Sequence, residues 1–174
     1  MVTLSQTYDT RDVGTGKKVT PLATINKGPN NYDITYFTAT GEITPKALTM
    51  SGLSVPTSKV YDGTTATVIS GTAALQTAET AGTGTTADGK PYTNDTVSIT
   101  GTASGTYNSK NVADASTVTY SGLSLTGAQS GNYTLTIQSP ASATITAKAL
   151  SVSGTVTADN KVYDGNTNAV VNGS

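Results

Sequence analysis

The sequence predicts an all-β protein made of tandem repeats of about 100 residues, and three observations support this prediction. The block that begins at Lys46-Ala47-Leu48 returns at Lys148-Ala149-Leu150, 102 positions later and without a gap. Apolar residues recur at every second position in short runs, which is typical of half-buried strands. Gly-containing turn signals separate the runs, and no segment keeps a helical period. We therefore expect antiparallel β-sandwiches of the immunoglobulin-like kind, arranged as an extended rod.

The internal matches divide the chain into three parts. Upstream of the repeated block, Thr7-Tyr8 matches Thr106-Tyr107, and the offset drifts from 99 to 102 through small changes in turn length. The predicted parts are the C-terminal part of one repeat (1–45), a complete repeat (46–147) and the N-terminal part of the next repeat (148–174). Because the chain opens and stops inside a unit, we expect it to be a window on a longer polypeptide.

Strands of the complete repeat are predicted from pairs of apolar residues at period two. In order, these residues are Leu48 and Met50, Val97 and Ile99, Val118 and Tyr120, Leu123 and Leu125, Tyr133 with Leu135 and Ile137, and Ala143 and Ile145. Residues Gln76 to Asp95 interrupt the pattern with small polar residues, which predicts a long loop that buries almost nothing, with a hairpin at Asp88-Gly89. The junction at 144–152 contains no Gly or Pro, which favours a stiff connection between repeats.

Composition excludes several classes of function. Charged residues are 12% of the chain, the net charge is −1 and the pI is about 5.2, so clustered basic residues for nucleic acid or anionic membrane are lacking. The sequence has no Cys and no His, which excludes disulfides, thiolate and imidazole catalysis and ordinary zinc sites. The first residues lack the pattern of a signal peptide, and no apolar run is long enough to span a membrane. We expect neither an enzyme nor a cofactor.

The motif Lys-Val-Tyr-Asp-Gly occurs in both copies of the repeated block. Asp can bond its own backbone and Gly accepts a positive φ, so the motif predicts a structural turn with a packed tyrosine. Its candidate residues are Tyr61, Asp62 and Gly63 in the first copy and Tyr163, Asp164 and Gly165 in the second. The alternative is a calcium site that combines Asp62 with Asp95 or Asp114, although the spacing matches no known loop.

Two further groups of residues have a structural and a functional interpretation. Tyr107, Tyr120 and Tyr133, like Tyr8 and Tyr32, fall in or beside strands, which favours core tyrosines over an exposed platform for sugars. Lys59 and Asn132 are the residue types of an intramolecular isopeptide bond, a reaction that needs a nearby acid. The complete repeat offers a single Glu, Glu79, and it falls in the polar loop.

Five ordered motifs resemble the YDG repeat domain. They are Lys59 to Thr65, Tyr107 to Val112, Ser121 to Leu123, Gly131 to Leu135 and Ile145 to Leu150. The chain departs from the pattern in its long stretch from Gln76 to Asp95 and in Arg11-Asp12, where Lys110-Asn111 stands in the complete repeat. The resemblance implies a β-rich extracellular module of large bacterial surface or secreted adhesins, including filamentous-haemagglutinin-like proteins, and it carries no catalytic residues.

These observations predict a structural repeat of a bacterial cell-surface or extracellular fibre, acting as stalk or filament building block. The alternative is a module that recognises a glycan or a matrix protein through the loop at about 76–95, with affinity multiplied by repetition. Expected partners are neighbouring repeats of the same protein, joined covalently or head to tail by strand complementation, with head-to-tail or lateral self-association into a fibre. An unknown glycan or matrix ligand is the further possibility.

Overall fold

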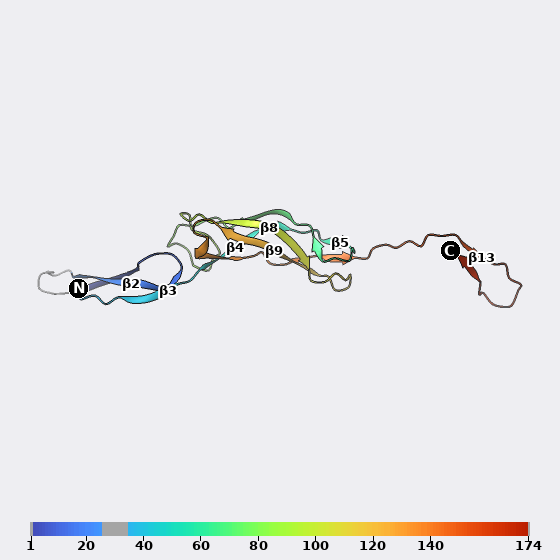
Figure 1. The fold of residues 1–174 in the computed structure, drawn as a ribbon, viewed down its shortest axis with the longest axis horizontal. Helices are drawn as coiled ribbons and strands as arrows, with labels where there is room; N and C mark the ends of the chain where they lie inside the picture. Colours follow the sequence, from blue (N-terminus) through green and yellow to red (C-terminus); the bar gives the residue numbers. More distant parts are fainter. Residues whose placement is uncertain (1, 26–34, 174) are drawn as a thin grey trace.

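The computed structural model describes residues 2–25 and 35–173, and in these residues the protein is all-β (Figure 1). This confirms the predicted class. Helical structure in the described residues is limited to one 3-10 turn, η2 (Ser130–Asn132). Within the same residues, no helix has the length and hydropathy needed to cross a membrane. Tyr32, one of the predicted core tyrosines, lies outside the described residues.

The strands form a small sheet, a central body and a terminal hairpin that follow one another along the longest axis of Figure 1. The first sheet contains β1 (Val2–Tyr8), β2 (Gly14–Ile25) and β3 (Ala39–Ile43). The central body contains β4 (Lys46–Ser54), β5 (Ser58–Val60), β6 (Ala66–Thr67), β7 (Ser70–Leu75), β8 (Ser98–Tyr107), β9 (Thr117–Thr126), β10 (Tyr133–Thr136), β11 (Ala141–Ser142) and β12 (Thr144–Thr146). The hairpin contains β13 (Val156–Ala158) and β14 (Val171–Gly173).

Two sheets pack against each other in the central body. One has the order β10-β4-β7 and the other β11-β9-β8-β6. Met50 and Leu53 of β4 contact Tyr120 of β9, with flanking apolar residues from β7, β8 and β10. A second cluster joins Tyr107, Ala115, Val118, Ala143 and Ile145. The core lies between the two sheets because the alternating apolar residues of each sheet face inward.

The expectation of a purely antiparallel arrangement is wrong at two strand pairs. Strand β10 pairs with β4 in parallel, and β12 pairs with β5 in parallel. In each pair an early strand of the central body lies beside a late one. The parallel direction follows because the chain enters the body beside β3 and leaves it at the opposite end, beyond β12 (Figure 1). An early strand and a late strand that each run from the entry end towards the exit end therefore point in the same direction.

The three strands of the first sheet have the same register as three strands of the central body. Tyr8 lies opposite Val19, and Tyr107 lies opposite Val118, with both residues 99 positions further on. Val19 in turn lies opposite Ala39, as Val118 lies opposite Ala141. The backbone bond from Asp9 N to Lys18 O (2.9 Å) likewise corresponds to that from Asn108 N to Thr117 O (3.0 Å). Sheet β1-β2-β3 therefore corresponds to β8-β9-β11.

Residues 147–155 contain no strand and are exposed. Leu150 is 90% exposed, whereas Leu48, at the matching position of the repeated block, is fully buried in β4. Leu48 lies opposite Leu135 of β10. The same local sequence thus forms a strand where β10 and β7 flank it, and an extended segment where the described residues offer no such neighbours.

The long loop packs more closely than predicted. Gly89 and Pro91 are buried, and the carbonyl of Gly89 accepts a hydrogen bond from Thr49 N (3.0 Å). Glu79 forms an isolated parallel bridge with Tyr92. Asp88-Gly89 is therefore not the tip of a hairpin, because it lies against β4. The prediction of a loop that buries almost nothing is wrong for residues 88–92.

Candidate functional site

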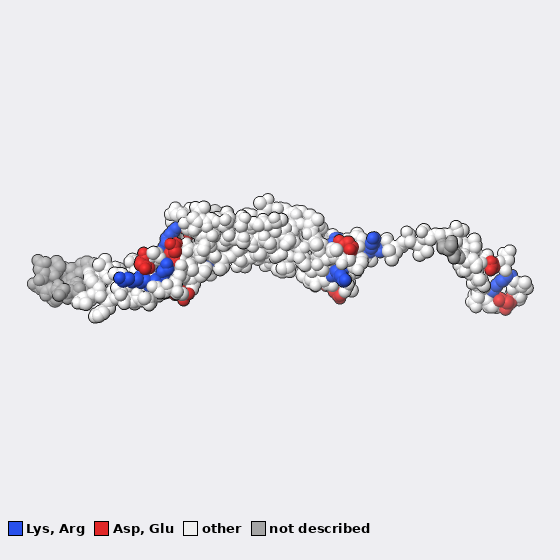
Figure 2. All heavy atoms as spheres, in the orientation of Figure 1, with Lys and Arg blue, Asp and Glu red and all other residues white. Residues whose placement is uncertain are grey.

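Charged side chains of the central body gather at its two ends (Figure 2). Strands β7, β8, β9 and β10 contain no Asp, Glu, Lys or Arg. At the entry end, beside β3, Lys46 pairs with Glu79 and Asp88, and Asp95 pairs with Arg11. At the exit end, where β5 lies beside β12, Lys59 pairs with Asp62, and the loop between β8 and β9 carries Lys110 and Asp114. Ionic interactions of the central body are therefore concentrated at its two ends, because the strands between them carry no charged side chains.

At the entry end, Lys46 is a buried ammonium between two carboxylates. Its Nζ lies 2.7 Å from Glu79 Oε1 and 2.9 Å from Asp88 Oδ1, and its side chain is 7% exposed. The ammonium also lies 4.3 Å from the centre of the Tyr92 ring, close enough for a cation–π contact. Burial disfavours the charged form, but the hydrogen bonds with Glu79 and Asp88 raise the pKa of Lys46 above its usual range.

The ion pairs attach the long loop to the first strand of the body. The N–H of Lys90 and the ammonium of Lys46 together hold the pKa of Asp88 below its usual range. Gln76 Nε2 donates to the carbonyl of Asp88 (3.1 Å). All these partners come from β4 or from the loop itself. The cluster therefore fixes the loop, and its charges are already paired with one another.

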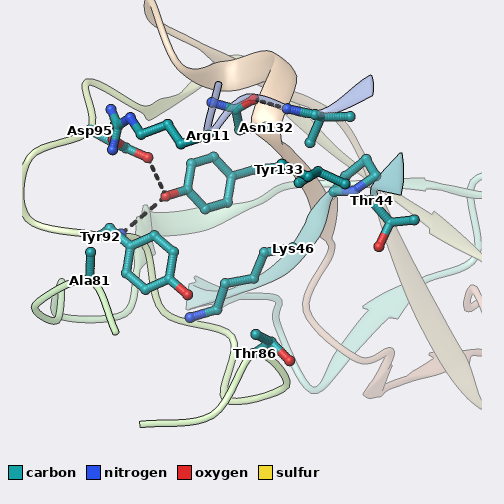
Figure 3. Close-up of a pocket in the computed structure, with 12 residues that line it drawn as sticks. Arg11, Thr44, Lys46, Ala81, Thr86, Tyr92, Asp95, Asn132 and Tyr133 are labelled. Carbon is teal, nitrogen blue, oxygen red and sulfur yellow. Dashed lines mark hydrogen bonds and ion pairs between the residues drawn. The ribbon is translucent and has the colours of Figure 1, made fainter. Parts of the chain in front are cut away.

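Beside this cluster is a cavity of about 400 Å³ (Figure 3). Its walls come from the first sheet and from the central body, as Arg11, Val13, Ile43, Thr44, Pro45, Lys46, Ala81, Thr86, Tyr92, Asp95, Asn132 and Tyr133. On one wall, the Tyr133 hydroxyl donates to Asp95 Oδ2 (2.7 Å) and accepts from Tyr92 N (3.2 Å). Burial, and then the hydrogen bond with Asp95, raise the pKa of Tyr133 to about 12.

Three consecutive residues before β2 contact the central body, two through side chains and one through its backbone N–H. Arg11 Nη2 lies 2.6 Å from Asp95 Oδ1, whose side chain is 4% exposed. Asn132 Nδ2 donates to Asp12 Oδ1 (2.8 Å), and Asn132 Oδ1 accepts from Val13 N (2.9 Å). These contacts hold the loop between β1 and β2 against the entry end of the body.

At the exit end, the Lys-Val-Tyr-Asp-Gly motif forms a turn around a lysine. Lys59 Nζ donates to Asp62 Oδ1 (2.8 Å) and to the carbonyls of Thr64 (2.9 Å) and Ala66 (2.8 Å). Asp62 Oδ1 also accepts from Thr64 N (2.9 Å). The lysine and the threonine together lower the pKa of Asp62 to about 2. Gly63 has a φ of 82°, which side chains rarely tolerate.

The second copy of the motif forms the same turn. Lys161 Nζ donates to Asp164 Oδ1 (2.8 Å) and to the carbonyl of Asn166 (2.9 Å), and Asn166 N donates to Asp164 Oδ1 (3.1 Å). Gly165 has a φ of 76°. Since Tyr163 is 93% exposed there, the turn forms without a packed core around it.

The structure places the predicted turn residues in turns but gives the tyrosine a different position. Tyr61 is 38% exposed, whereas the side chain of Lys59 is 15% exposed. Lys59, rather than Tyr61, lies on the inside of the turn, because the oxygens of the turn face its ammonium group. The expectation of a packed tyrosine in this motif is therefore wrong.

The calcium alternative is not supported by the geometry. Asp62 is paired with Lys59, and Asp95 lies at the opposite end with Arg11 and Tyr133. Asp114 accepts from Asn111 Nδ2 (3.2 Å). Among the described residues, no group of three or more carboxylates is placed to hold a metal. Each carboxylate of the predicted set already has its own partner.

The isopeptide hypothesis is wrong. Lys59 is held in the exit-end turn, and Asn132 binds Asp12 and Val13 at the entry end. Glu79 pairs with Lys46. The three residues that the reaction requires are therefore engaged separately, because the chain places β5 and η2 at opposite ends of the body.

The three strand tyrosines that were predicted to be core residues of the complete repeat are buried. Tyr107, Tyr120 and Tyr133 are 2%, 3% and 6% exposed. The hydroxyl of Tyr107 donates to the carbonyl of Thr144 (3.2 Å). Tyr8 differs, at 44% exposed. No described residue of the first sheet belongs to either core cluster, so one face of Tyr8 stays open.

Sequence reasoning missed the lysines that organise both ends. Lys46 precedes Leu48 and Met50 at period two, and this alternation places it on the buried face of β4. A charge on a buried face requires a partner, and the single Glu of the complete repeat could have been assigned to it. The contact of Arg11 with Asp95 has no comparable signal, since the two residues are far apart in sequence.

The central body, with its lysine-centred turn, is an all-β module to which the family comparison gives a name. Residues 44–143, more than half of the chain, match the YDG domain. The chain belongs to the YDG domain family, as the order of its motifs predicted. No curated protein and no solved structure was found to match the chain.

Proposed function

We propose that this chain is a stalk segment of a bacterial surface or extracellular fibre built from tandem, immunoglobulin-like YDG units. The observation that carries the proposal is the shared register of β1-β2-β3 and β8-β9-β11. In this proposal residues 1–45 end one unit, 46–147 form the next and 148–174 begin a third. Units of one fold, joined end to end, form a spacer that needs no catalytic residue.

The route of the chain through the body favours a linear fibre. Only two residues separate the end of β3 at Ile43 from the start of β4 at Lys46, and β12 ends at Thr146 at the far end of the body (Figure 1). A unit that receives the chain at one end and releases it at the other extends an array along its axis. Side-chain contacts such as Arg11 with Asp95 restrict the angle between successive parts.

Electron microscopy of the native protein tests this proposal. Strands of about 10 residues at about 3.3 Å per residue, with their loops, give an expected axial repeat of roughly 40 Å. A regular filament on the bacterial surface or in the medium, with that spacing, is the expected result. Isolated particles without an axial repeat, or location inside the cell, would overturn the proposal.

The second candidate is a ligand-binding module, which is favoured by the cavity of about 400 Å³ beside the long loop. Its wall combines the Tyr92 ring with Asp95 and Arg11, a combination of aromatic and polar groups suited to a sugar. Titration calorimetry with an oligosaccharide panel tests it. Saturable binding that Thr86→Trp abolishes, and that the distant Thr119→Trp preserves, would favour the binding module over a purely structural stalk.

A further inference from the structure

The exit end of the central body has an exposed, mostly apolar hollow. It has a volume of about 370 Å³ and is lined by Tyr61, Asn111, Val112, Ala147, Lys148 and Leu150. Val112 is 43% exposed and Leu150 is 90% exposed. Lys148 is the charged residue of the lining, and Lys110, which precedes Asn111 in the sequence, is also exposed. An apolar surface with a charged rim is typical of a docking surface.

The hollow corresponds to a surface that is already occupied elsewhere in the chain. Arg11, Asp12 and Val13 match Lys110, Asn111 and Val112, each 99 positions further on. The strands on either side of the two loops have the same register, as Tyr8 with Val19 and Tyr107 with Val118 show. The loops therefore leave equivalent hairpins at equivalent points.

The first loop docks on the central body through three contacts that the second loop has the chemistry to repeat. Arg11 pairs with Asp95, and Lys110 offers the same charge. Asp12 accepts from Asn132 Nδ2, and the amide oxygen of Asn111 is also an acceptor. The contact of Val13 uses only its backbone N–H, which Val112 also has. The required partner must thus present an Asp and an Asn placed as Asp95 and Asn132 are.

We propose that the exit end is the docking surface for a further YDG unit whose first strand begins at Lys148. That unit contacts Lys110, Asn111 and Val112 as the central body contacts Arg11, Asp12 and Val13. The other strands of that unit cover Leu150 as the central body covers Leu48, which is fully buried. The inference rests on the proposed tandem function and adds the residues that fix one unit against the next.

The test extends the full chain by one unit and traps the junction with cysteines. Residues 71–147 are appended after Asn172, which completes the third unit because Asn172 matches Ser70. The chain has no Cys, so an introduced pair is the sole source of a disulfide or of a short bismaleimide cross-link. The test pair is Val112→Cys with Asn132→Cys of the added unit. The reference pair is Val13→Cys with Asn132→Cys of the central body. In the unchanged protein, Val13 N lies 2.9 Å from Asn132 Oδ1.

An intramolecular cross-link at a rate close to that of the reference pair is the expected result. The control pair, Val112→Cys with Thr119→Cys of the added unit, places the second cysteine on the exposed face of β9 towards the far end. It should react at least about ten-fold more slowly, because tethering alone gives only a limited local concentration. A control rate equal to the test rate would overturn the docking geometry, as would a cross-link that joins two chains.

Substitution of Lys110 gives a second readout. Lys110→Glu should slow the test cross-link by about two- to five-fold, as expected for an ion pair whose cation is exposed, and Lys110→Arg, which places the residue type of Arg11 there, should preserve the rate. An unchanged rate in Lys110→Glu would overturn the role of Lys110. Circular dichroism and hydrogen exchange separate the two proposals. An added unit that does not fold contradicts the tandem function, whereas a folded unit that forms no cross-link contradicts only the docking surface.

Discussion

A single lysine organises the turn that gives the family its motif. Lys59 donates to four backbone or side-chain oxygens inside the turn. Lys161 makes the matching contacts with Asp164 and Asn166, in a part of the chain where Tyr163 is exposed. The turn is therefore a local structure, stabilised by short-range hydrogen bonds rather than by burial of its tyrosine. Asp62 takes part by accepting bonds from both sides of the turn.

The hydrogen bonds of Asp62 should make stability depend on pH. Its pKa falls from 3.8 to about 2 on folding, chiefly through the bond from Lys59. A lowered folded-state pKa stabilises the protein above the unfolded value, and this contribution is lost as the pH falls from about 4 through about 2. Urea unfolding at stepwise pH should show a smaller loss of stability over this range for Asp62→Asn than for the wild type. Lys59→Gln should also reduce the loss, and a steeper acid dependence in either variant would contradict the assignment.

The hydroxyls of two buried tyrosines should contribute unequally. Tyr133 donates to a carboxylate and Tyr107 to a neutral carbonyl. We expect Tyr133→Phe to lower the free energy of unfolding by about 2 kcal/mol and Tyr107→Phe by about 1 kcal/mol, because bonds to charged groups are stronger. Chemical denaturation at pH 7 measures both, and the reverse order would contradict this account.

Tyr133 should also affect the stability of the protein at high pH. Its folded-state pKa is raised from 10.0 to about 12 by burial and by Asp95, so its contribution is present below about pH 10. That contribution is lost as the pH rises through about 12. The wild type should therefore lose more stability across this range than Tyr133→Phe does, and equal losses would show that another group titrates.

At the scale of the element, paired glycines bend the central hairpin. The register of β8 and β9 shifts between Gly101 and Ser104, and Gly101 and Gly122 have φ values of 100° and 84°. A Cβ on Gly101 would meet the carbonyl oxygen of Gly122, and one on Gly122 would meet that of Thr102. The two strands approach closely here, so both backbone conformation and space require glycine.

We expect Gly101→Ala to lower the free energy of unfolding by about 2 kcal/mol or more, through backbone strain and the clash with Gly122. Thermal unfolding followed by circular dichroism measures the change. Gly131→Ala is the matched control, since no other atom lies within 4 Å of its Cβ position. A similar effect of both substitutions would show that the bulge is not the cause.

At the scale of the whole molecule, the two copies of one sequence block have opposite environments. Leu48 is fully buried beside β10 and β7, and Leu150 is 90% exposed. Leu48→Ala should lower the free energy of unfolding by about 3 kcal/mol, as expected for a buried leucine. Leu150→Ala should change it by less than about 0.5 kcal/mol. Denaturant titration of this chain checks both values, and a large effect of Leu150→Ala would show that residues 148–174 pack against the described body.

Much of the architecture could be predicted because it depends on local patterns. Apolar residues at period two predicted the strands, and the buried positions of Tyr107, Tyr120 and Tyr133 followed from the same alternation. The turn at Asp62-Gly63 followed from the backbone preferences of its residues. The repeated block needed only comparison of the sequence with itself. Each of these properties is fixed by residues close to one another in the chain.

The tertiary structure alone decided how distant segments meet. Pairing of Lys46 with Glu79 and Asp88, the contact of Arg11 with Asp95 and the parallel pairing of β4 with β10 all join residues far apart in sequence. Local preferences carry no information about such contacts, because their free energy arises only when the chain brings the partners together. By itself, therefore, the sequence determined the β class, the repeat, the turn motif and membership of the YDG family, whereas the charged ends and the surfaces available for joining units depended on the folded chain.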